Sequence, residues 1–288
     1  MMHKLIPSGF LILLFVTSSA VFAQKNILPN AYAHNDFWHK RPLLDALQNG
    51  FRHIEVDIFL RGDRLIVAHA FTFLKKKRTL EELYLIPLLN YIKENEIAGN
   101  GLNKYPITLM IDIKTDASKT YLALAPILEK YKSILSGYEN GRLTMRNATI
   151  VITGNKPYQL IRAKNNNFAF IDENLKQTGR DSTSNIYPIA SCKYSSLVKW
   201  KGKGELPEAQ RQRLEYFVTE AHKNGRKVRL WASPENKTVW HELLKCNVDL
   251  INTDRLIALR NFLMADLLMV AKVDDDLAIE KLLPLGTN

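Results

Sequence analysis

The chain has 288 residues, of which 46% are hydrophobic and 24% charged, and its formal net charge is +11. This is an ordinary globular composition without an internal repeat, low-complexity tract or linker, which excludes repeat architectures and indicates one domain. The positive balance favours anionic partners such as phosphate esters or membrane headgroups, although a solvated basic surface explains it as well. The densest basic cluster, residues 75–78, lacks the interleaved aromatic side chains that would indicate nucleic acid as a partner.

Residues 1–23 are predicted to be a signal peptide. His3 and Lys4 form a short basic start, residues 10–16 are an apolar run, and residues 21–23 offer a cleavage site. The apolar run is too short for a comfortable membrane span, and a retained anchor is the alternative interpretation. We therefore expect residues 24–288 to be secreted or periplasmic.

Strand-like and helix-like segments alternate along the rest of the chain. The helix at residues 42–47 has a proline at its first position, and the helix at residues 79–97 opens with a capping box. Strands are predicted at residues 32–34, 53–60, 64–69, 107–114, 149–153, 168–172, 187–193, 227–233 and 249–252. Further helices are predicted at residues 122–135, 158–164, 208–224 and 239–245.

Alternating β and α elements predict a parallel sheet covered by helices. When the strand at residues 64–69 is treated as a β-hairpin after the second strand, eight β-then-α steps remain. Eight units in roughly 250 residues fit a closed TIM (β/α)8 barrel. We expect a single α/β domain with a barrel core at about residues 30–260 and an extra C-terminal helical tail. A doubly wound open sheet is the main alternative.

Two acidic residues share one face of the second predicted strand. Ile54, Val56 and Ile58 occupy the face suited to packing against helices. Alternation places Glu55 and Asp57 on the other face, which points into a barrel. Carboxylates in a low-dielectric interior are costly unless positive charge or a proton compensates them. The compensating group is either a metal ion or a Lys or Arg side chain.

The third predicted strand repeats this pattern near its C-terminal end. Alternation places Asp112 and Lys114 on the opposite face of this strand from four apolar residues. Because the carboxyl ends of TIM-barrel strands form the active-site face, three carboxylates would converge on it. Such an oxygen-rich cluster favours Mg²⁺ or Ca²⁺ over zinc. Lys114 would offset the charge of a bound phosphate, or else pair with Asp112.

Two histidines at predicted strand ends bracket these acids. His34 ends the first strand and His69 ends the hairpin. Cleavage of a phosphodiester needs one group to deprotonate a nucleophile and another to protonate the leaving alkoxide, and imidazole does both near neutral pH. His34 and His69 are therefore the candidate proton-transfer pair.

This ordered set of residues resembles the core of the phospholipase C-like phosphodiesterase superfamily, which includes glycerophosphodiester phosphodiesterases and phosphoinositide-specific phospholipases C. The matching pieces are His34, residues 55–57, His69, residues 112–114, residues 230–232 and residues 252–254. Residues 33–37 and 80–84 are most similar to its altered inheritance of mitochondria branch.

The resemblance implies a TIM barrel with a divalent cation at its carboxyl end. The residues that it assigns are Glu55, Asp57 and Asp112 as metal ligands, His34 as general base, His69 as general acid, and Trp231 as part of the substrate pocket with Lys114. Glycerophosphodiesterases usually carry Arg after the first histidine and Glu on the third strand, where this chain has Asn35 and Asp112. Asn at that position resembles the phospholipases C, which implies Asn35 as a fourth metal ligand.

The leading hypothesis is an exported, metal-dependent phosphoric diester hydrolase acting on a glycerophosphodiester or a phospholipid-headgroup-like substrate, with a small-molecule or lipid partner. The alternatives are a non-catalytic barrel that binds anionic lipid or glycan, and a metal-dependent hydrolase of an amide or phosphomonoester. Peripheral membrane contact and the oligomeric state stay open. Cys192 and Cys246 either form a disulfide or remain buried thiols.

Overall fold

The computed structural model describes residues 27–70, 78–98, 105–163, 165–180 and 185–265. Eight parallel strands lie in the order β10-β9-β8-β7-β4-β2-β1-β11, and β3 (Arg64–Val67) pairs antiparallel with β2. The parallel strands are β1 (Leu28–Ala33), β2 (Phe51–Arg61), β4 (Ile107–Ile113), β7 (Ala148–Gly154), β8 (Phe170–Asn174), β9 (Ile189–Lys193), β10 (Lys227–Trp231) and β11 (Ile251–Thr253).

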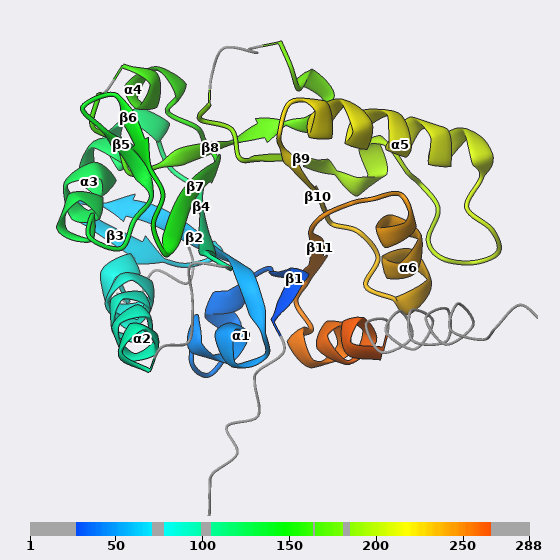
Figure 1. Ribbon diagram of the computed structural model, residues 1–288, viewed down its shortest axis with the longest axis horizontal. Coiled ribbons are helices and arrows are strands. Elements are labelled where there is room, and N and C mark those ends of the chain that lie inside the picture. Colours follow the sequence, from blue (N-terminus) through cyan, green and yellow to red (C-terminus); the bar gives the residue numbers. More distant parts are fainter. Residues whose placement is uncertain (1–26, 71–77, 99–104, 164, 181–184, 266–288) are drawn as a thin grey trace, which may run out of the picture.

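The two end strands of this order also meet, which closes the sheet. The Leu250 N–H donates to the Val228 carbonyl at 3.0 Å, and Arg229 forms a parallel bridge with Leu250. The strands therefore form a nearly closed barrel, with the helices on its outside (Figure 1). The predicted (β/α)8 architecture with a hairpin after the second strand is confirmed, and the open-sheet alternative is wrong.

Side-chain caps that the sequence encodes start two of the outer helices, α3 and α6. Asp116 accepts from the Lys119 N–H at 2.7 Å and so starts α3, while Asn236 accepts from the Val239 N–H at 3.0 Å and starts α6. The predicted capping box at residues 79–82 forms, and a π-helical turn (Glu81–Leu85) follows it. The helices are α1 (Leu44–Gln48), α2 (Ile86–Ile97), α3 (Ala117–Lys130), α4 (Tyr158–Arg162), α5 (Glu208–Lys223) and α6 (Lys237–Lys245).

The barrel wall separates two apolar layers. Ile54, Val56 and Ile58 are fully buried in the large core between strands and helices, as alternation along β2 predicts. Each such side chain stabilises the fold by about 1.5–3 kcal/mol of burial. A second, smaller cluster holds alternate residues of the other strands, which are Tyr32, Met110, Val151, Phe170, Ile189 and Leu250.

Three local predictions need correction. The hairpin strand ends at Val67, so His69 lies beyond it; the Ala68 N–H donates to the Asp57 carbonyl at 3.2 Å and brings His69 beside that residue. Helix α3 begins and ends five residues earlier than the predicted range 122–135, because Asp116 caps it. One of the eight predicted β-then-α steps has no α-helix in the described residues, because those between β8 and β9 contain only a 3₁₀ turn, Leu175–Gln177.

A further hairpin was not predicted. Strands β5 (Gly137–Glu139) and β6 (Arg142–Thr144) pair antiparallel across Asn140 and Gly141, whose φ angles are 52° and 75°. Asn-Gly favours the left-handed conformations that two-residue hairpin turns require, so this dipeptide is the signal that could have predicted it.

The ends of the chain carry two predictions that stay untested. The signal peptide falls on residues outside those the structure describes, as does the helical tail beyond residue 265, although residues 256–265 are helical. Within the described residues, none of the helices is long and apolar enough to cross a membrane.

The loop that follows β1 is anchored by a buried carboxylate. Asp36 accepts a hydrogen bond from the Leu43 N–H at 2.5 Å and another from the Tyr84 hydroxyl at 3.0 Å. Burial raises the pKa of Asp36 to about 6, although both hydrogen bonds oppose that shift. Because His34 immediately precedes this loop, the anchor joins the outer helical layer to the carboxyl end of the barrel.

The Tyr84→Phe substitution removes one donor from a buried carboxylate. We expect the free energy of unfolding to fall by about 1–3 kcal/mol, the cost of a buried group left short of a partner. Urea denaturation followed by circular dichroism measures this. Tyr216→Phe is the matched control, because Tyr216 is 61% exposed, and should change stability by less than about 0.5 kcal/mol. Equal losses in both variants would contradict the role of this anchor.

Candidate active site

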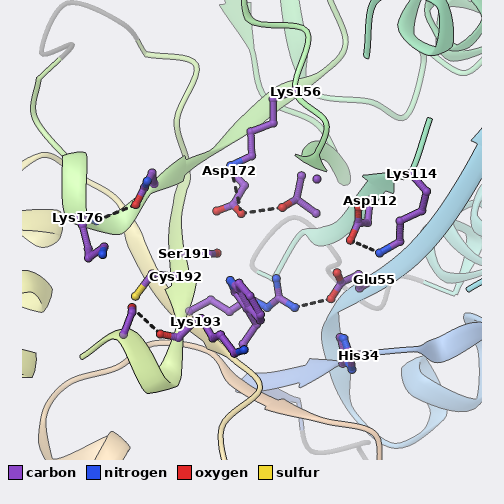
Figure 2. A pocket seen from close by; sticks show the side chains of 16 residues that line it. His34, Glu55, Asp112, Lys114, Lys156, Asp172, Lys176, Ser191, Cys192 and Lys193 are labelled. Atoms are coloured by element: carbon purple, nitrogen blue, oxygen red, sulfur yellow. Dashed lines mark hydrogen bonds and ion pairs between the residues drawn. The ribbon is translucent and has the colours of Figure 1, made fainter. Parts of the chain in front are cut away.

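The carboxyl ends of the barrel strands open into a cavity of about 650 Å³. Figure 2 shows its two sides, with His34, Glu55, Asp112 and Lys114 on one and Lys176, Cys192 and Lys193 on the other. Of the residues predicted for the site, the lining includes His34, Glu55, Asp112, Lys114 and Trp231.

The three predicted acids meet, as the strand register requires. Asp57 of β2 lies opposite Asp112 of β4, and Glu55 lies two residues earlier on the same face of β2. One carboxylate oxygen from each of the three lies within 4.8 Å of the others. Glu55 and Asp57 are only 4% and 3% exposed, so these charges are held largely out of water.

Two basic side chains partly compensate this charge. The Lys114 Nζ lies 2.6 Å from Asp112 Oδ2 and 3.3 Å from Asp57 Oδ2. The Arg229 guanidinium donates to Glu55 Oε2, and the Tyr32 hydroxyl donates to the same oxygen at 3.0 Å. Burial lowers the pKa of Lys114, but Asp112 and Asp57 outweigh burial and raise it overall, so the ammonium stays charged.

The cluster nevertheless fits a divalent cation. Three carboxylates face two cationic side chains, and burial together with the charges of Asp112 and Glu55 raises the pKa of Asp57 to about 6, although Lys114 opposes the rise. Asp112 Oδ1 is buried and has no hydrogen-bond partner in the described structure. The Lys114 ammonium already occupies a cation position between two of the acids. An oxygen-only donor set suits Mg²⁺ or Ca²⁺.

Gly154, at the end of β7, leaves the space into which Asp112 reaches. A Cβ at this position would lie 2.0 Å from Asp112 Oδ1 and 2.7 Å from the Ile113 carbonyl, and the φ of Gly154 is +69°. Both the contact and the backbone conformation therefore require glycine. Sequence reasoning missed this residue, although a Gly that ends an inward-facing strand is a signal for close approach.

His34 is held by a carboxylate that directly follows the last strand, β11. Its Nδ1 lies 2.5 Å from Asp254 Oδ1, and because a carboxylate only accepts, Nδ1 carries the proton. Burial lowers the pKa of His34, but the bond to Asp254 and the charge of Glu55 outweigh burial and raise it. Asp254 is itself fixed by Glu235, whose Oε1 accepts from the Asp254 N–H at 2.8 Å. The Nε2 atom of His34 is therefore the ring nitrogen left to contact a ligand in the cavity.

Asn35 also contacts Asp254. Its Nδ2 lies 3.2 and 3.3 Å from the two oxygens of Asp254 and 3.0 Å from His34 Nδ1. The φ of Asn35 is 47°, a left-handed conformation that Asn adopts more readily than most residues. The two hydrogen bonds that Nδ2 donates to Asp254 orient the side-chain amide, so the structure provides a positioning contact for Asn35, and its predicted role as a metal ligand stays a prediction.

His69 is held by one of the three acids. Its Nδ1 is 2.9 Å from Asp57 Oδ2, its side chain is half exposed, and its ring stacks at 6.3 Å on Phe37. His69 and Asp57 are not among the described residues that line the cavity. Each predicted histidine therefore contacts a different carboxylate, Asp254 for His34 and Asp57 for His69.

Trp231 and Arg229 come from the same strand, β10. Trp231 is partly exposed in the cavity, with the Lys193 Nζ 5.7 Å from its ring centroid. Arg229 is 2% exposed, and its guanidinium lies 4.1 Å from the Tyr32 ring centroid. Sequence reasoning missed Arg229. The alternation that predicted an inward Glu55 applies here too, since Val228 and Leu230 pack in the outer core and Arg229 lies between them.

Further polar residues of the cavity were not predicted. They lie within or just after β7, β8 and β9 and include Lys156, Asp172, Lys176, Ser191 and Lys193. Cys192 also lines the cavity, and both cysteines are buried free thiols, so the disulfide interpretation is wrong. Burial raises the pKa of both thiols, that of Cys246 to about 11.

Comparison with known proteins identifies relatives of this chain. The model of the AIM6-like phosphodiesterase domain matches residues 22–172. Altered inheritance of mitochondria protein 6 of Eremothecium gossypii is 29% identical over 271 residues, which cover 82% of this chain and 70% of that protein. Its homolog in Arthroderma benhamiae is 29% identical over 262 residues, which cover 80% of this chain and 82% of that protein.

Two solved structures are more distant. A glycerophosphodiester phosphodiesterase from Agrobacterium tumefaciens aligns with a TM-score of 0.45 at 13% identity, covering 83% of this chain and 95% of that one. A phosphatidylinositol-specific phospholipase C from Listeria monocytogenes gives 0.36 at 13% identity, covering 79% and 96%. At these scores the likeness says nothing about chemistry.

Gly154→Ala tests how Asp112 is placed. We expect the added methyl to displace the Asp112 carboxylate and to weaken Mn²⁺ binding by roughly 10-fold or more, since loss of one well-placed charged contact costs about 1.5–3 kcal/mol. Isothermal titration calorimetry measures this. Gly204→Ala is the control, because Gly204 has a similar φ of +66° and nothing within 4 Å of its added Cβ. Unchanged Mn²⁺ affinity in Gly154→Ala would show that Asp112 does not hold the ion.

Proposed function

The chain belongs to the AIM6-like phosphodiesterase domain family, and from this premise we propose that it is a metal-dependent phosphoric diester hydrolase in which His34 and His69 move the protons. One observation supports this most. The Glu55, Asp57 and Asp112 carboxylates gather within 4.8 Å at the carboxyl end of the barrel, and a carboxylate holds each of the two histidines, Asp254 for His34 and Asp57 for His69. This arrangement offers a cation site and two proton-transfer groups around one position.

The three carboxylates would hold the divalent ion. When bound, such an ion neutralises a non-bridging phosphate oxygen and lowers the pKa of a nucleophile beside it. Lys114 would then turn from the acids towards the phosphate, which its partly exposed side chain permits. Arg229 stays on Glu55 Oε2, so Oε1 is the Glu55 oxygen left for a ligand.

His34 would act as the general base. Since its Nδ1 donates to Asp254, the neutral ring has its lone pair on Nε2. Water or a neighbouring substrate hydroxyl attacks phosphorus, and its proton passes to Nε2 as the new P–O bond forms. Asp254 stabilises the resulting imidazolium through the existing hydrogen bond.

His69 would act as the general acid. Its Nδ1 donates to Asp57, which fixes the ring and leaves Nε2 to give its proton to the alkoxide as the old P–O bond breaks. Attack by a substrate hydroxyl leaves a cyclic phosphate, and attack by water leaves a phosphomonoester. The proton balance is the same for both.

We also propose an exported enzyme whose substrate is a glycerophosphodiester or a phospholipid headgroup. Export is supported by the predicted signal peptide at residues 1–23. The substrate class is supported by the family and by a cavity of about 650 Å³, large enough for a headgroup-sized ligand.

Removal of divalent cations should abolish turnover. We expect purified enzyme treated with EDTA to lose activity on bis(p-nitrophenyl) phosphate, and Mg²⁺, Ca²⁺ or Mn²⁺ to restore it. Asp57→Asn should lower Mn²⁺ affinity, measured by calorimetry in the absence of substrate, because it removes a charged ligand. Asp63→Asn, on the turn between β2 and β3, is the control. Full activity in EDTA would contradict the proposal, because the Lys114 ammonium would then provide the positive charge at the acids without a metal ion.

Substrates with different leaving groups distinguish the roles of the two histidines. His34→Ala should lower kcat about 10²–10⁴-fold on every diester, because a nucleophile always loses a proton. His69→Ala should cost as much on glycerophosphocholine, whose leaving alkoxide needs a proton, but little on bis(p-nitrophenyl) phosphate, whose phenolate leaves unaided. His241→Ala, at the exposed His241 of α6, is the control. If His34→Ala spared bis(p-nitrophenyl) phosphate and His69→Ala slowed every diester, His69 would be the general base and His34 the general acid.

A further inference from the structure

The side of the cavity away from the acid cluster is lined by lysines. Lys156 follows β7, Lys176 lies in the turn after β8, and Lys193 ends β9. In Figure 2 Lys176 and Lys193 lie across the cavity from Asp112 and Glu55, with Lys156 and Asp172 between the two sides. Three successive strands thus each deliver one ammonium group to the cavity, and those of Lys176 and Lys193 lie on the wall away from the acids.

The wall has fewer negative than positive charges. Among the described lining residues, Asp172 is the carboxylate that pairs with one of these lysines. Its Oδ2 lies 3.9 Å from the Lys156 Nζ and accepts a hydrogen bond from the Thr153 hydroxyl at 2.9 Å. Lys176 and Lys193 have no carboxylate within 4.0 Å in the described part of the chain. Two ammonium groups therefore remain to meet a ligand in the cavity.

The aromatic side chain on this wall is already occupied. The Lys193 Nζ lies 5.7 Å from the Trp231 ring centroid, in the position that a cationic ligand would need for a cation–π contact. A trimethylammonium headgroup would have to displace Lys193 and would meet Lys176 nearby. The wall is therefore unsuited to a choline-like alcohol.

We propose that the preferred diester carries a second anionic group, a phosphate or carboxylate, on the alcohol that lies in this half of the cavity, where Lys176 and Lys193 bind it. This inference rests on the proposed function, and it defines the charge class of the substrate. The scissile phosphate lies at the acid cluster, and the second anion lies across the cavity. Lys156, paired with Asp172, borders both positions.

Matched substrates that differ by one phosphate test the proposal. We expect kcat/KM for glycerophosphoinositol 4-phosphate to exceed that for glycerophosphoinositol by roughly 10-fold or more, the worth of one charged hydrogen bond. Glycerophosphocholine should be the poorest of the three. Phosphatidylinositol and its 4-phosphate in neutral detergent micelles form a second pair, and comparison of the two pairs separates a lipid source from a soluble one. Equal rates within both pairs would overturn the proposal.

Charge reversal at the two lysines tests which residues are responsible. Lys176→Glu with Lys193→Glu should remove the preference for the phosphorylated member of each pair, a fall of roughly 10-fold or more in the ratio of the two kcat/KM values. Lys199→Glu with Lys201→Glu makes the same change in net charge outside the cavity, and that ratio should stay unchanged. An equal fall in both double variants would indicate a general field effect and would contradict the assignment.

The outcomes separate this inference from the proposed function. Turnover of bis(p-nitrophenyl) phosphate without any preference for the phosphorylated member of a pair would refute the anion subsite and leave the diesterase assignment intact. Absence of turnover with all of these diesters in saturating Mg²⁺ or Ca²⁺ would refute the proposed function itself.

Discussion

Three carboxylates held within 4.8 Å of one another at the end of a barrel repel each other, and the rest of the site depends on how that charge is compensated. Two of them are almost fully buried, where solvent screens little. Their positions follow from β2 and β4, whose register places Asp57 opposite Asp112. A sheet that closes into a barrel directs these side chains into one place, and that place requires cations.

The compensating groups divide into a fixed one and a replaceable one. Arg229 is buried, contacts the Tyr32 ring and is tied to both Glu55 and Asn252, so it is part of the barrel interior. Loss of either partner of such a buried pair typically costs about 3–5 kcal/mol. Lys114 is partly exposed on a flexible stem, so a metal ion can take its place between the acids. This difference explains how one cluster can be both stable and ready to bind an ion.

Proton transfer requires orientation as well as charge. His34 and His69 each present Nδ1 to a carboxylate, and each therefore keeps Nε2 for a ligand. The support extends outward, because Glu235 holds Asp254 while Asp36 and Tyr84 hold the loop after His34. The functional side chains are thus positioned by the strands themselves and by polar contacts that reach the helical layer.

Much of this could be predicted from the sequence. Alternation along single strands predicted the inward acids, and β-α alternation predicted the barrel, because both depend on local patterns. Partnerships between distant strands were missed: Arg229 with Glu55 spans 174 residues and Asp254 with His34 spans 220. Parity does indicate that Arg229 points inward, but only the closed barrel identifies the carboxylate it meets. The cavity lysines that follow β7 and β8 and end β9 were missed for the same reason, since each looks like an ordinary charged residue until three strands bring them to one cavity.

The central claim is that the three acids share a divalent ion. Anomalous diffraction from crystals grown with Mn²⁺ and a non-hydrolysable phosphodiester tests it most directly. The account predicts one peak at roughly 2.0–2.6 Å, the range for hard divalent ions, from oxygens of Glu55, Asp57 and Asp112, with the Lys114 ammonium moved away from Asp57. A well-ordered site without that peak, in which Lys114 still bridges Asp57 and Asp112, would contradict it.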